Sequence, residues 1–113
     1  MTAKLPNYLR TFRKRAYLTQ DELAFLLGGE SGTRVSRYEL FGRVPGLETA
    51  LAYQIIFAEP PDELFAGLHA RIAGEVRSRA DVLLKRMEQG RSSPVLAHKL
   101  AVLRSIAEKG GSN

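Results

Sequence analysis

The sequence predicts an all-α protein, with a bundle of about five helices in residues 1–66 and a two-helix extension in residues 67–113. Apolar residues recur at intervals of three and four, which places them along one face of a helix. Residues that favour the first and last turns of helices stand at the ends of these segments. No segment alternates apolar and polar residues in the manner of a half-buried strand.

The first two predicted helices have clear boundary signals. The first is expected to bury apolar residues spaced three and four apart, namely Tyr8, Leu9, Phe12 and Ala16. Thr19 is a suitable N-cap for the second helix, and Glu22 completes a capping box three residues later. This second helix should bury Leu23, Ala24 and Leu27 and end at the pair Gly28 and Gly29.

The third and fourth predicted helices also have residues that mark where they begin or end. Ser31 or Gly32 opens a short third helix with Val35 and Tyr38 facing inward, and Gly42 should end it. Residues 47–58 form a strongly apolar fourth helix, which contains Leu47, Ala50, Leu51 and Ile55, with Phe57 near its end. Pro60 and Pro61 close this helix because neither can donate a helical hydrogen bond, and Asp62 should cap the segment that follows.

The extension is predicted to contain two helices with apolar stripes. The first stripe runs through Leu68, Ile72, Val76, Ala80, Leu83 and Met87, and Gly90 ends that helix. Ser93 followed by Pro94 is a start signal for the second helix. Its stripe runs through Leu96, Leu100, Leu103 and Ala107. These stripes are expected either to join two subunits, which we favour, or to pack on the core of their own chain.

Composition excludes several classes of protein. The 113 residues include no cysteine, which excludes a disulfide framework, a zinc finger, a thiol nucleophile and an iron–sulfur cluster. His69 and His98 are the only histidines, so a metal site is not expected. No apolar run is long enough to span a membrane, and no apolar leader follows the basic residues near the start. We therefore expect a cytoplasmic protein.

The net charge of +5 is unevenly distributed. Residues 1–43 carry eight basic and four acidic side chains, whereas residues 44–66 carry four acidic side chains and no basic one. Residues 67–113 carry nine basic and four acidic side chains. Local charge determines which surface meets a polyanion, so the basic segments are candidate nucleic-acid contacts. For the extension, the alternative that its arginines and lysines only solubilise the helices is equally favoured.

The order of elements and several residues resemble the Cro/C-repressor (XRE-like) helix-turn-helix family over residues 8–66. The matching segments are Leu-Thr-Gln-Asp-Glu-Leu-Ala (18–24), Gly28 or Gly29, Val-Ser-Arg-Tyr-Glu (35–39), Pro45 with Leu47, and Asp-Glu-Leu-Phe (62–65). The resemblance implies a lambda-repressor-like bundle that binds DNA. This chain has one more residue than the family between Ala24 and Val35, which lengthens the turn.

The helix around residues 31–40 then becomes the candidate recognition helix, because it carries polar side chains opposite its apolar ones. The candidate base contacts are Thr33, Arg34, Ser36 and Arg37. Arginine can donate two hydrogen bonds to guanine, and threonine or serine can meet a base edge or a thymine methyl group. Arg37 is the first choice for base readout and Thr33 the second.

Other residues are assigned to phosphates or to structure. The candidate phosphate contacts are Gln20, Ser31 and Arg43, the first of them suggested by the family and favoured by the unpaired N–H groups at a helix start. Lys14 and Arg15 are weaker candidates on the first helix. The resemblance also implies that Arg13 and Glu39 form a structural ion pair.

These features predict a sequence-specific regulator of transcription that binds double-stranded DNA, most simply as a two-fold homodimer. The alternative is an antitoxin-like or antirepressor-like interaction module whose helical tail binds a partner protein. We do not expect an enzyme, a catalytic residue, a metal or a cofactor, because no nucleophile–base set and no phosphate-binding loop is present in the sequence.

Overall fold

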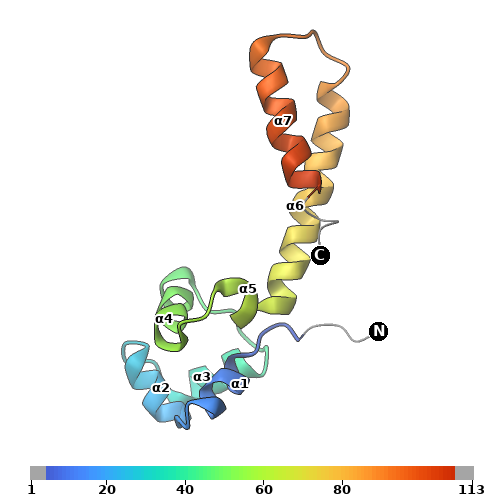
Figure 1. The fold of residues 1–113 in the computed structure, drawn as a ribbon. Coiled ribbons are helices and arrows are strands. Elements are labelled where there is room, and N and C mark those ends of the chain that lie inside the picture. Colours follow the sequence, from blue (N-terminus) through green and yellow to red (C-terminus); the bar gives the residue numbers. More distant parts are fainter. Residues whose placement is uncertain (1–4, 109–113) are drawn as a thin grey trace. The chain divides into compact units, whose positions relative to one another are not determined.

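A computed structural model describes residues 5–108, which form seven α-helices and no strand (Figure 1). The helices are α1 (Leu9–Arg15), α2 (Gln20–Leu26), α3 (Gly32–Glu39), α4 (Leu47–Phe57), α5 (Pro61–Leu64), α6 (Ala66–Met87) and α7 (Pro94–Glu108). The all-α prediction is therefore confirmed. The chain divides into two compact units, the first ending at His69 and the second beginning at Ala70.

Side-chain caps begin three of the helices, as the sequence predicts. The Thr19 hydroxyl accepts a hydrogen bond from the Glu22 N–H at 3.0 Å, and the Glu22 carboxylate accepts one from the Thr19 N–H at 2.8 Å. The Ser31 hydroxyl accepts from the Arg34 N–H at 3.0 Å and so caps α3. Ser93 caps α7 in the same way. These bonds satisfy donors that the first turn of a helix leaves unpaired.

Each of the first three helices is followed within two residues by a residue with left-handed backbone conformation. In α2 that residue is Gly28, with φ of 101°, and the N–H groups of Gly28 and Gly29 bond back to the carbonyls of Phe25 and Ala24. The equivalent left-handed residues are Tyr17 after α1 and Phe41 after α3. The predicted stop at Gly42 is thus displaced by one residue, because Phe41 makes the turn.

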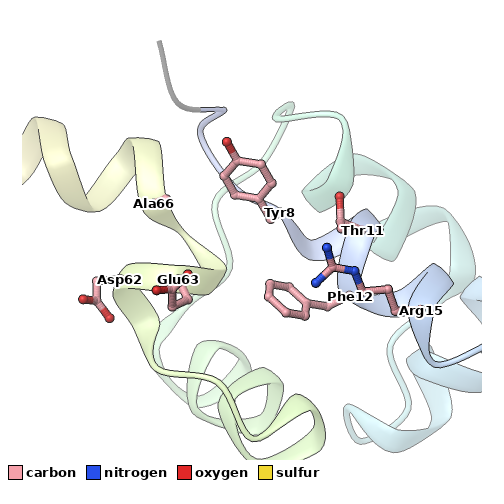
Figure 2. A pocket seen from close by; sticks show the side chains of 7 residues that line it. All are labelled: Tyr8, Thr11, Phe12, Arg15, Asp62, Glu63 and Ala66. Atoms are coloured by element: carbon pink, nitrogen blue, oxygen red, sulfur yellow. The ribbon is translucent and has the colours of Figure 1, made fainter. Parts of the chain in front are cut away.

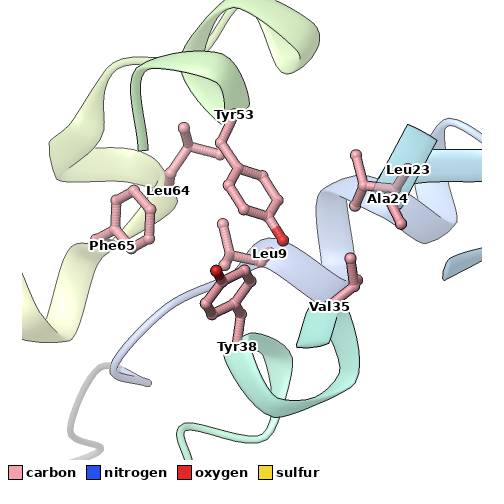
Figure 3. Close-up of a cluster of buried hydrophobic side chains, with 8 residues drawn as sticks. All are labelled: Leu9, Leu23, Ala24, Val35, Tyr38, Tyr53, Leu64 and Phe65. Atoms are coloured by element: carbon pink, nitrogen blue, oxygen red, sulfur yellow. The ribbon is translucent and has the colours of Figure 1, made fainter. Parts of the chain in front are cut away.

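The core of the first unit joins all of its helices (Figure 3). Its fully buried side chains are Leu9, Leu23, Val35, Tyr53 and Leu64. The Tyr53 ring lies edge-on to the rings of Tyr38 and Phe65, with centroids 6.3 and 6.4 Å apart. Leu68, at the start of α6, packs against this core rather than belonging to the second unit.

Two sequence expectations for the first unit are wrong, at Ala16 and at Asp62. Ala16 is exposed because it is the C-cap of α1 and no longer faces the core. In α4 the buried residue is Tyr53, whereas Leu47, Leu51 and Ile55 lie on the exposed side. Asp62 is not a cap, because α5 already begins at Pro61 with Pro60 before it.

The second unit is a helical hairpin of residues 70–108, in which α7 runs back beside the later part of α6 (Figure 1). Ala80 is its one buried residue within the described chain. On α6 the predicted stripe is only partly covered, since Ile72, Val76 and Leu83 are exposed and Met87 is half-buried. On α7 the stripe residues Leu96, Leu100 and Leu103 are half-buried. Of the helices in residues 5–108, none is both long and apolar enough to cross a membrane.

Candidate nucleic-acid interface

Helices α2 and α3 pack directly against each other and form a helix-turn-helix arrangement. Leu23 and Ala24 from α2 and Val35 from α3 are buried along their seam. The small side chain of Ala24 allows the two helices to approach closely. The longer turn, residues 27–31, is accommodated by two consecutive left-handed glycines, Gly28 and Gly29. The extra residue therefore leaves the inward positions of α3, Val35 and Tyr38, buried.

The outward face of α3 carries two exposed polar side chains, Thr33 and Arg37. Neither forms an ion pair or a side-chain hydrogen bond with another described residue. Arg37 therefore keeps all five of its N–H donors available for a ligand. Both positions fit the sequence expectation of outward-facing contact residues.

Arg34 and Ser36 are half-buried, so the four candidate base contacts are not equivalent. The Arg34 guanidinium lies 3.5 Å from the Glu30 carboxylate. Glu30 also accepts a hydrogen bond from the Tyr38 hydroxyl at 3.1 Å. Glu30 therefore ties the turn to two residues on one side of α3. Sequence reasoning missed this role, although Glu30 and Arg34 have the spacing of a helical ion pair.

The expected ion pair between Arg13 and Glu39 is formed, and it is buried. Arg13 donates from Nε and Nη2 to the two Glu39 carboxylate oxygens, at 2.6 and 3.1 Å. Its Nη1 donates to the Leu18 carbonyl at 2.9 Å. The hydrogen bond to Glu39 raises the pKa of Arg13 above its ordinary value, although burial opposes the shift. This pair fixes the end of α3 against α1 and the loop before α2.

Two of the candidate phosphate contacts have partners within the chain. The Gln20 side-chain amide, in the first turn of α2, donates to Glu39 at 3.2 Å. The Ser31 hydroxyl oxygen accepts the capping bond at α3, which leaves its O–H free to donate. Arg43 is exposed in the turn after α3 and forms no ion pair with the residues that the structure describes. Each can still offer at least one N–H or O–H to an anion.

A groove of about 480 Å³ lies between α1, the start of α2 and α3. Its lining brings Arg10 and Lys14 from α1 together with Gln20 and Ser36. Arg10 and Lys14 are exposed and form no ion pair within the described chain. Sequence reasoning missed Arg10, although its four-residue spacing from Lys14 places both on one side of α1. The groove is therefore bordered by two cations beside a candidate base contact.

Arg15 belongs to a different pocket, of about 300 Å³, between α1 and α5 (Figure 2). Its guanidinium lies 5.5 Å from the centre of the Phe12 ring. Asp62 and Glu63 line the same pocket. Lys14 and Arg15, the two weaker phosphate candidates on α1, therefore line different pockets.

Within residues 5–108 no cluster of three or more His, Cys, Asp or Glu side chains has the arrangement of a metal site. No family model, no curated protein and no solved structure matches this chain.

Proposed function

We propose that this protein binds double-stranded DNA sequence-specifically and regulates transcription, with α3 entering the major groove. The observation that carries the proposal is the contrast between the two faces of α3. On one side, Val35, Tyr38 and Glu39 are buried. On the other side, Thr33 and Arg37 are exposed and form no ion pair or side-chain hydrogen bond with another described residue. Exposed donors on a firmly anchored helix are what base readout requires.

The dimensions and chemistry of α3 suit this role. With its side chains an α-helix is about 10–12 Å in diameter, and the major groove is about 12 Å wide. Arg37 would hold guanine O6 and N7 with two hydrogen bonds, and Thr33 would meet a neighbouring base. Arg34 would contact a base or a phosphate only by leaving Glu30, and Ser36 would contribute at the border of the groove.

Phosphate contacts would come from both sides of α3. Arg43 lies in the turn after the helix, and Ser31 caps its start with a free O–H. Gln20, Arg10 and Lys14 line the groove beside it. Such contacts position a protein on the duplex and make its affinity depend on salt.

A domain of this size makes few contacts alone, so we propose that it binds as a homodimer on two half-sites about one helical turn apart. This role is that of a binding protein in the cytoplasm rather than an enzyme.

Selection of bound sequences from a pool of random duplexes tests the proposal. A palindromic consensus is expected. Arg37→Ala should weaken binding to that consensus by about 1–3 kcal/mol and affect random DNA less, whereas Arg43→Ala should weaken both and reduce the salt dependence. Arg91→Ala, which removes an exposed charge outside this surface, is the matched control. Equal losses on both DNAs for Arg37→Ala would refute its role in base readout.

A selection without enrichment would favour the protein-interaction module instead. The exposed apolar residues of α4 and of the hairpin are the observation that supports this second candidate. Co-purification of a single partner protein with the full chain, lost after deletion of residues 70–113, would then identify the tail as its binding element.

A further inference from the structure

The exposed side of α4 is apolar, which is unusual for a helix at the surface of a small domain. Leu47, Leu51 and Ile55 are 75%, 48% and 80% exposed, although they stand four residues apart along a single line. Tyr53, on the opposite side, is fully buried. A helix that is apolar on all sides is usually buried on all sides. This stripe, called here the α4 face, is therefore expected to be covered in the functional assembly.

The charged side chains of residues 44–66, the segment that contains α4, are all negative. Glu48 stands beside its first leucine, and Glu59 follows the end of the helix. Asp62 and Glu63 come next in the chain, and residues 44–66 contain no basic side chain. None of these four carboxylates forms an ion pair with another described residue. A partner for this face should therefore combine an apolar stripe with positive charge.

The hairpin of residues 70–108 has this combination. Ile72, Val76 and Leu83 are each 38–45% exposed along one side of α6. By helical spacing, Arg79 and Arg86 border this stripe, and both are exposed and form no ion pair within the described chain. The hairpin buries only Ala80 among its described residues, so it lacks an interior of its own.

We propose that the hairpin of one copy of this chain docks on the α4 face of a second copy, with Arg79 and Arg86 meeting Glu48 and Glu59. A two-fold dimer would form this contact twice and would cover both apolar surfaces. Pairing the two hairpins with each other would instead bring like charges together and leave both α4 faces exposed. The inference rests on the homodimer of the proposed function but not on DNA binding.

Cysteine crosslinking of the full chain tests which surfaces meet, because the native sequence has no cysteine. Equal amounts of Leu51→Cys and Val76→Cys protein, mixed and oxidised, should give mainly the mixed disulfide dimer. Phe25→Cys, at an exposed position of α2, is the matched control and should not crosslink to Val76→Cys. A prevalence of the Val76→Cys homodimer would overturn the proposal in favour of hairpin pairing. A double variant that crosslinks only within a monomer would overturn it in favour of contact within one chain.

Charge reversal provides an independent measurement of the same contact. In sedimentation equilibrium, Glu48→Lys with Glu59→Lys should raise the dimer dissociation constant about tenfold or more, a change of about 1.4 kcal/mol. The further changes Arg79→Glu and Arg86→Glu in the same chain should restore it. These residues are exposed or half-buried, and circular dichroism will show that the variants fold. An unchanged dimer constant, or a monomeric native chain, would overturn the proposal. A dimer that fails to select DNA would refute only the proposed function.

Discussion

The two units of this chain differ in how many side chains they bury. The first unit surrounds five fully buried side chains with helices that are tied by a buried ion pair. The hairpin buries a single alanine among its described residues, and its ion pairs are exposed. Helical propensity and an apolar stripe are therefore enough to form helices. A buried core also needs neighbouring helices against which those stripes can pack.

The largest contrast should come from truncating one leucine in each unit. Leu23→Ala should lower the free energy of unfolding by about 2–5 kcal/mol, because it leaves a cavity in a closed core. Leu100→Ala, at a half-buried position of α7, should cost clearly less. Denaturant titration of the two variants measures both effects. Equal losses in the free energy of unfolding would mean that the hairpin has a core of its own and that the two units do not differ in burial.

Breaking one ion pair in each unit should also lower the free energy of unfolding by different amounts. Arg13→Leu leaves the Glu39 carboxylate buried without its partner and should cost about 3 kcal/mol or more. Arg104→Leu breaks the 3.3 Å pair with Glu88, whose side chains are about half exposed, and should cost less than about 1 kcal/mol. Raising the salt concentration should weaken only the second pair appreciably. A loss for Arg13→Leu below that for Arg104→Leu would contradict the structure.

A smaller effect should come from Tyr53, whose hydroxyl is buried and has no hydrogen-bond partner among the described residues. Tyr53→Phe removes this hydroxyl and keeps the ring, so the free energy of unfolding should rise by about 1 kcal/mol. Tyr17→Phe, at an almost fully exposed position, is the matched control and should change little. A destabilised Tyr53→Phe variant would show that the hydroxyl does have a partner.

The buried Tyr53 hydroxyl should also make the stability of the native protein depend on pH in the alkaline range. Burial raises the pKa of the Tyr53 hydroxyl above its ordinary value of about 10, because the charged phenolate is poorly solvated in the core. Above pH 10 the unfolded chain releases this proton while the folded chain retains it, so the native protein should lose stability as the pH rises. In Tyr53→Phe this part of the loss should be absent, which unfolding curves at pH 8 and pH 11 can compare.

The sequence predicts features that depend on neighbouring residues much better than features that depend on distant ones. The caps at Thr19, Ser31 and Ser93 involve residues only three positions apart, and the structure has all three. The inward positions Val35 and Tyr38 follow from the polar residues opposite them. Local chemistry of this kind is the same in a peptide and in the folded chain.

Helix α4 shows why features that depend on distant residues were not predictable from the sequence. Because α4 has apolar residues around most of its circumference, its sequence does not indicate which side faces the core. The structure buries Tyr53 and leaves Leu47, Leu51 and Ile55 exposed. The groove with Arg10 and Lys14 likewise depends on how α1 packs beside α3. By contrast, the ion pair between Glu30 and Arg34 has a signal in the sequence, because the two residues stand four positions apart.

The anchoring of α3 has a consequence for how this protein can evolve. Val35, Tyr38 and Glu39 hold the helix, while Thr33 and Arg37 form no ion pair or side-chain hydrogen bond with any other described residue. In the proposed DNA-binding role of α3, substitutions at these two positions should therefore change the bases that are read without a penalty in folding. Related chains could diverge in specificity one mutation at a time, with every intermediate still folded.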